Sequence, residues 1–214
     1  MSGIIAQNTL DNSGLIKAPA GGGAWNFIKK LTAASSATVS FVDGSSDVDL
    51  SSYKLYLFTF KNIHLSTDSE PDFLVNFSSD GGSNYDVTKT STSFYARHAE
   101  NNDFASLSYY TSSDLAQSTA NQYIGFNVEG ADADGSLSGS MYLWNPASTV
   151  FVKHYMINVS QMQDYPAAWQ WVNAGYCNTT SAIDAVRFYG EYGNGSASTI
   201  DTGDICLYGL TTWQ

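Results

Sequence analysis

Residues 182–188, Ala-Ile-Asp-Ala-Val-Arg-Phe, and residues 204–210, Asp-Ile-Cys-Leu-Tyr-Gly-Leu, flank a stretch rich in Gly, Ser, Thr and Asp. Each is a short run of apolar, β-branched and aromatic residues bounded by turn-forming residues, which is the pattern of a β-strand. We expect these two strands to close an antiparallel β-sandwich. No catalytic motif has this pattern.

The earlier residues repeat the alternation of apolar and polar side chains. In one segment, Leu55 and Leu57 point to one face, whereas Tyr56, Phe58 and Phe60 point to the other. Apolar residues on both faces indicate a central strand covered on both sides, or one whose outer face meets a partner. Strands are expected at residues 25–31, 37–42, 53–65, 73–78, 93–98, 106–111, 123–128, 138–144, 150–159, 168–172, 182–189 and 202–210.

The segment that begins at Phe73 alternates cleanly: Phe73, Val75 and Phe77 form an inward set, whereas Asn76 and Ser78 point outward. Residues 80–84, which include two glycines, then supply a turn that tolerates positive φ. The one expected helical piece is a single turn within residues 113–119.

The 214 residues fit one all-β domain, because β-sandwiches run to roughly 200–250 residues without splitting. Many short strands separated by turns predict a jelly-roll-like antiparallel β-sandwich over residues 24–214. Residues 1–23 are polar and Gly-rich, so we expect an N-terminal arm that contacts neighbouring subunits.

Charged residues make up only 14% of the chain, against roughly 25% in an average soluble domain. The net charge of −11 repels phosphate backbones and anionic membrane surfaces, so nucleic-acid binding is disfavoured. Lys29 and Lys30 form the only adjacent basic pair. The N-terminal residues lack the pattern of a signal peptide, and no apolar run is long enough for membrane insertion.

A calcium site is the one metal site that the sequence suggests. Glu129, Asp132 and Asp134 place three carboxylates on a Gly-containing loop, and oxygen ligands so spaced can hold Ca²⁺. The alternative is a solvated acidic turn, because the EF-hand pattern is incomplete. We expect no cofactor.

No catalytic centre is expected. Gly135 to Gly139 come close to a Gly-X-Ser-X-Gly nucleophile elbow, but Leu137 occupies the position of the nucleophile, so the segment is interpreted as the start of a strand. The histidines at 64, 98 and 154 are too far apart for a sequence-local metal site. The two cysteines at 177 and 206 are expected to be buried free thiols rather than a disulfide.

Trp169 and Trp171 alternate with Gln170, which places both indoles on one face of a strand about 7 Å apart. That spacing suits a glycan platform as well as a core layer or subunit interface. Exposure decides: solvent-facing indoles favour sugar binding, whereas buried indoles exclude a platform.

Four segments in order resemble a module of structural and tail-fibre-like proteins in marine and cyanobacterial tailed phages. They are Tyr53 to Ile63, Phe73 to Asp86 with its Phe-Ser-Ser-Asp-Gly-Gly-Ser-Asn-Tyr core, Leu137 to Pro146, and Ala182 to Leu210 with its terminal Leu-Tyr-Gly-Leu. The resemblance implies a non-enzymatic sandwich on a virion that is assembled in the host cytoplasm, with no catalytic residues to carry over. Thr202-Gly203-Asp204 replaces the Ser-Gly-Thr often found in such proteins.

The resemblance leaves the position on the particle open. A tail appendage or fibre-type protein on the particle exterior would bind a cell-surface glycan during host attachment. A capsid decoration (cement) protein would instead make a broad contact with the capsid. The enzyme alternative is a carbohydrate-active depolymerase. Partners implied by the virion setting are other virion proteins, contacted through residues 1–23, and further copies of the chain, with a homotrimer expected for a fibre tip.

Overall fold

The computed structural model describes residues 25–66, 71–163 and 166–210, and the predicted N-terminal arm lies outside them. Over these ranges the fold is entirely β, with neither the predicted helical turn at 113–119 nor any helix that could span a membrane. The strands are β1 (Trp25–Ser36), β2 (Val39–Val42), β3 (Leu55–Leu65), β4 (Asp72–Ser78), β5 (Lys89–Ala99), β6 (Ala105–Tyr109), β7 (Gln122–Gly125), β8 (Leu137–Trp144), β9 (Lys153–Gln163), β10 (Ala167–Cys177), β11 (Ala185–Glu191), β12 (Ala197–Ser198) and β13 (Ile200–Leu210).

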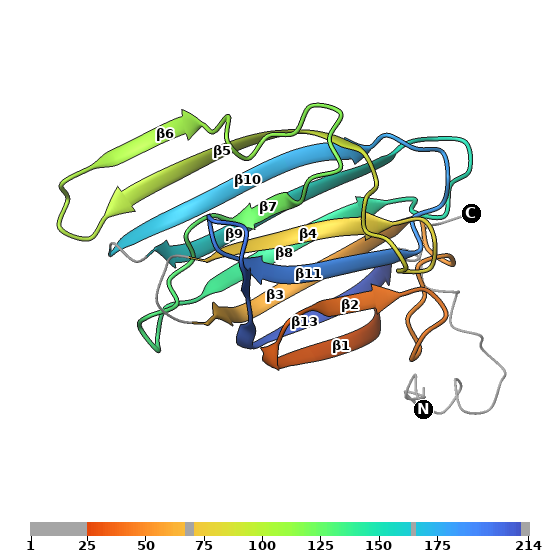
Figure 1. Ribbon diagram of the computed structural model, residues 1–214, viewed down its shortest axis with the longest axis horizontal. Coiled ribbons are helices and arrows are strands. Elements are labelled where there is room, and N and C mark those ends of the chain that lie inside the picture. Colours follow the sequence, from red (N-terminus) through yellow and green to blue (C-terminus); the bar gives the residue numbers. More distant parts are fainter. Residues whose placement is uncertain (1–24, 67–70, 164–165, 211–214) are drawn as a thin grey trace, which may run out of the picture.

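The strands form two antiparallel sheets that face each other, which confirms the all-β sandwich (Figure 1). The large sheet has eight strands in the order β1-β13-β3-β8-β9-β10-β5-β6, and the small sheet has the order β12-β11-β4-β7, with β2 also paired to β11. A jelly roll stays a prediction, because this unequal division of strands does not establish its connectivity.

The two segments that predict the fold lie in opposite sheets. Strand β11 is the centre of the small sheet, where it pairs with β4 on one side and with β2 and β12 on the other. Strand β13 pairs with β1 and β3 in the large sheet. Each segment therefore organises one layer of the sandwich.

An aromatic cluster around Phe188 joins the layers. Its ring centroid lies 5.4 Å from that of Phe58, 5.3 Å from Phe60, 6.1 Å from Phe73 and 6.2 Å from Phe41, and all five side chains are buried. Most of these contacts have the tilted or edge-to-face geometry that aromatic pairs prefer. The aromatic faces that the sequence predicts for strands β3 and β4 therefore lie in the core.

Strand β4 departs from its prediction on the other face. Asn76 and Ser78 do not reach solvent: they are 1% and 0% exposed. The Asn76 amide donates to the Thr119 carbonyl oxygen and to the Asn121 Oδ1 atom, so the chain that precedes β7 covers it. The turn after β4 matches its prediction, because Gly81 and Gly82 have φ values of 72° and 79°.

Some strand boundaries also differ from prediction. Val150 and Phe151 precede β9 rather than belonging to it, because the Ser148 Oγ atom accepts hydrogen bonds from both of their backbone amides and holds a turn. Their side chains are 69% and 68% exposed. The two-residue strand β12 has no counterpart among the predicted segments.

Candidate functional site

The three carboxylates of the calcium candidate do not converge. The buried Glu129 carboxylate accepts hydrogen bonds from the backbone amides of Ala131 and Asp132, at 2.6 and 2.8 Å, so it caps its own loop. Asp132 and Asp134 are exposed. Over the described ranges no three acidic, His or Cys side chains lie together as metal ligands would.

The three histidines have separate surroundings. His64 on β3 contacts the Asp132 carbonyl oxygen at 3.2 Å, and His98 on β5 contacts Asn102 at 3.0 Å. His154 on β9 packs on the ring of Tyr176. Among the residues that the structure describes, the hydrogen bonds of His64 and His98 join neither ring to a Ser, Thr or Cys side chain, and Leu137 begins β8.

The two cysteines lie on opposite faces of the large sheet and are free. Cys177 is buried, as predicted, whereas Cys206 is half-buried on the outer face. Cys177 is paired in register with Lys89 of β5 and Lys153 of β9, so one thiol and two amino groups stand in a buried row. Burial raises the pKa of the Cys177 thiol to about 12, despite the opposing effect of both lysines, and the thiol is therefore unreactive.

Both buried lysines hold loops in place. The Lys89 Nζ atom donates to the Asn76 Oδ1 atom and to the Val87 carbonyl oxygen, at 2.7 Å each. Lys153 donates to the carbonyl oxygens of Thr179 and Ser181. Burial lowers the pKa of Lys89 to about 8. These contacts have a structural purpose, because they satisfy the carbonyl groups of two chain reversals.

The structure excludes an exposed glycan platform on β10. Trp169 and Trp171 are only 6% and 1% exposed, because both lie on the inner face of the large sheet. The two indoles stack with centroids 5.8 Å apart and planes inclined by 13°. Tyr95 on β5 packs against both, at 4.7 and 5.0 Å. Of the alternatives open from the sequence, the core layer is therefore the one that the structure shows, because strand alternation alone does not say which face is covered.

The stacked indoles instead form part of a cavity of about 380 Å³, next to the part of the large sheet where β5 and β6 extend beyond the small sheet (Figure 1). Its remaining walls are aromatic and polar side chains from the β5–β6, β6–β7 and β7–β8 connections and from the end of β9: Phe104, Tyr110, Phe126 and Gln163. Arg97 of β5 also lines it.

Sequence reasoning missed Arg97. Its guanidinium carbon lies 4.6 Å from the ring centroid of Phe104, 4.9 Å from that of Trp169 and 5.6 Å from that of Tyr95. Among the described residues, the two ion pairs are Lys29–Asp47 and Lys30–Asp204, so Arg97 has no carboxylate partner there. The sequence does contain a signal for this residue. In Tyr95-Ala96-Arg97, the alternation of side chains along a strand places the arginine on the same face as the tyrosine ring.

The outer face of the large sheet is a second candidate site. Residues paired in register make continuous rows across it, and in the central row only uncharged side chains occur. That row is Phe27, Tyr208, Leu57, Tyr142, Met156, Ala174 and Thr92, from β1 to β5. The next row is Lys30, Cys206, Thr59, Ser140, Asn158, Val172, Phe94 and Tyr109, from β1 to β6.

Five adjacent strands of this face, β8, β9, β10, β5 and β6, direct no Asp, Glu, Lys or Arg side chain outward, because Lys89, Arg97 and Lys153 point to the inner face. A groove of about 680 Å³ lies on the same face, and Trp144, His154, Met156 and Tyr176 contribute to its lining. We call this area, from β8 to β6, the uncharged face.

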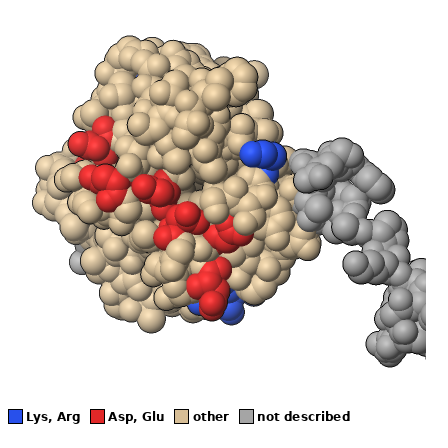
Figure 2. Space-filling model, turned by 90° about the vertical axis from the view of Figure 1, so that its right-hand side faces the viewer, with Lys and Arg blue, Asp and Glu red and all other residues tan. Residues whose placement is uncertain are grey.

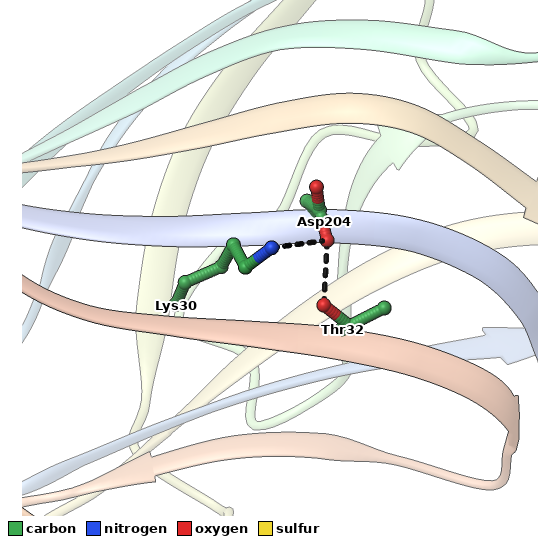
Figure 3. Close-up of polar contacts among 3 residues, drawn as sticks. All are labelled: Lys30, Thr32 and Asp204. Carbon is green, nitrogen blue, oxygen red and sulfur yellow. Dashed lines mark hydrogen bonds and ion pairs between the residues drawn. The ribbon is translucent and has the colours of Figure 1, made fainter.

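Charged groups are gathered elsewhere. Figure 2 shows acidic side chains in a band across one end of the sandwich, where the connections β2–β3, β4–β5 and β10–β11 contain Asp43, Asp47, Asp49, Asp80, Asp86 and Asp184. On the outer face, a small polar group lies on β1 and β13: Thr32 donates to Asp204 at 2.6 Å and Lys30 pairs with it at 3.5 Å (Figure 3). The Thr32 hydrogen bond, aided by Lys30, lowers the pKa of Asp204.

Comparisons with known proteins identify no relative: no family model, no curated protein and no solved structure matches this chain. The likeness to phage structural modules therefore stays a prediction, and function has to be inferred from the cavity and the uncharged face.

Proposed function

We propose that this chain is a non-enzymatic structural subunit on the exterior of a tailed-phage virion, of the tail appendage or fibre type. We further propose that it assembles with other copies of itself through the uncharged face. The observation that carries the assembly role is the run of five adjacent strands whose outward side chains are aromatic, aliphatic or uncharged polar.

The distribution of charge favours self-association at this face. Two copies of a chain with net charge −11 repel each other wherever their acidic residues meet. The uncharged face brings no like charges together, whereas the acidic end of the sandwich would. Depletion of charged side chains with enrichment of aromatic residues and Met is typical of the buried centre of an interface.

The size of the face is sufficient. The five strands of the uncharged face, about 4.8 Å apart, span roughly 24 Å, and four outward rows at about 7 Å spacing span roughly 28 Å. The product is about 670 Å², which lies toward the lower end of the roughly 600–1,000 Å² that each partner buries in a standard stable interface. Met156, which is 48% exposed at the centre of this area, would be covered on assembly.

The virion setting is supported by the sequence resemblance and by the small share of charged residues, which is typical of subunits packed in large assemblies. A capsid decoration protein is the alternative and would use the same face against the capsid. Antibody labelling of purified particles distinguishes tail from capsid. If the purified particles of a phage that encodes this chain do not contain it, the virion setting is refuted. That result would not bear on the proposed self-association.

Analytical ultracentrifugation tests the assembly role. We expect an oligomer at micromolar concentration, which Met156→Asp converts to monomer because it places a charge at the centre of the face. Ser83→Asp, in the exposed turn after β4, adds the same charge elsewhere and should leave the oligomer intact. A wild-type chain that stays monomeric at roughly 100 µM would contradict self-association, as would an unaltered Met156→Asp oligomer.

A further inference from the structure

We propose that the cavity around Arg97 binds the carboxylate of an acidic sugar, such as a uronic acid residue, with the guanidinium as its anion-binding group. This ligand site goes beyond the structural role proposed above and does not depend on it. The residues that the large sheet contributes to it lie on the inner face of that sheet, whereas the assembly face is the outer one.

Arg97 is held in a fixed position with most of its donors unused. Its Nε atom donates to the Ser106 Oγ atom at 3.0 Å, and three aromatic rings surround the guanidinium plane. The terminal nitrogens have no acceptor among the described residues. A guanidinium fixed in this way presents a planar pair of N–H donors that matches the two oxygens of a carboxylate.

The lining is rich in donors that lack acceptors. The indole Nε1 atoms of Trp169 and Trp171 are buried without a hydrogen-bond partner in the structure. Buried donors without acceptors are uncommon because each loses the free energy of its bond with water. Trp169, Trp171 and Arg97 all line the cavity and bring N–H donors, and no Asp or Glu is among the lining residues, so an acceptor-rich anion complements this lining better than a cation does.

The other lining groups favour a sugar over a simple aliphatic acid. A pyranose ring combines an apolar C–H face with hydroxyl groups at its rim. The rings of Tyr95, Phe104 and Tyr110 provide apolar walls, and the Gln163 carboxamide can both donate to and accept from hydroxyls. The volume of about 380 Å³ lies at the lower end of small-molecule sites, so it suits one or two sugar rings.

The experiment uses the full chain and matched probe pairs. Isothermal titration and saturation-transfer NMR would compare glucuronate with glucose, galacturonate with galactose, and both acids with hexanoate. Arg97→Gln removes the charge within the cavity, and Lys54→Gln removes one exposed charge on another part of the sandwich. Tryptophan fluorescence adds a local readout, because two of the five tryptophans line the cavity.

We expect a uronate to bind and its neutral counterpart to bind at least tenfold more weakly, since bonds to a charged group contribute roughly 10- to 100-fold in affinity. The Arg97→Gln variant should bind the uronate at least tenfold more weakly than the wild type does. The Lys54→Gln variant should bind it with the affinity of the wild type. A melting temperature shows whether Arg97→Gln still folds; if it does not, the acid-versus-neutral comparison on the wild type decides. Equal binding of acid and neutral sugar, hexanoate binding as tightly as a uronate, or no binding of either uronate would overturn the proposal.

Discussion

Replacement of Phe188 by alanine tests the core of the sandwich. Phe188 is fully buried between the sheets, and its ring contacts Phe41, Phe58, Phe60 and Phe73. Truncation removes a buried aromatic ring and leaves a space that the four flanking rings, fixed in β2, β3 and β4, can fill only in part. We therefore expect the free energy of unfolding to fall by about 3–5 kcal/mol.

Urea denaturation followed by tryptophan fluorescence would measure this loss, and thermal unfolding should show a drop of roughly 10 °C in melting temperature for a chain of this size. Phe188→Leu keeps much of the volume and should cost less than half as much. Phe151→Ala is the matched control, because that ring is 68% exposed and its removal should change stability by less than about 0.5 kcal/mol. An unchanged denaturation midpoint for Phe188→Ala would mean that the ring does not join the two sheets.

Three further outcomes follow from the packing. Phe77→Ala should also cost about 3–5 kcal/mol, because the ring is fully buried against Tyr155; a melting temperature like that of the wild type would place it at the surface. The pKa of Lys89 falls from 10.5 to about 8 on folding, so the unfolded chain binds more protons above pH 8; stability should rise by roughly 1 kcal/mol between pH 7 and 9. Lys89→Met should remove this rise in denaturation curves taken at both pH values, and an identical rise in that variant would assign it to another group. In thiol labelling, the native chain should leave Cys177 unmodified, whereas the half-buried Cys206 on the outer face should react; rapid labelling of Cys177 would contradict its burial.

Local patterns predicted the fold class well. Alternation in β3 correctly assigns Tyr56, Phe58 and Phe60 to the core and Leu55 and Leu57 to the other face. This works because the side chains of a strand alternate strictly and each apolar face must be covered. The ends of the strands were predicted less accurately. The apolar side chain of Phe151 fits a strand pattern, but the turn held by Ser148 excludes this residue from β9.

The candidate sites needed contacts between residues far apart in sequence. Alternation places Trp169 and Trp171 on one face of β10, but only the packing of β5 and of the chain around Phe126 shows that this face is the covered one. Likewise, nothing local to Arg97 indicates that Phe104 and Trp169 surround its guanidinium.

By itself, the sequence determined that the chain is all-β, that its strands bury aromatic faces and that its surface carries little positive charge. Period-two alternation, turn-forming residues and composition are local properties, and they do not depend on which strands become neighbours. The tertiary structure alone decided that neutral outward residues of five strands form one continuous face and that an arginine lies beside two buried indoles. Both features depend on strand order and register, which are set by the packing of the two sheets over the whole chain.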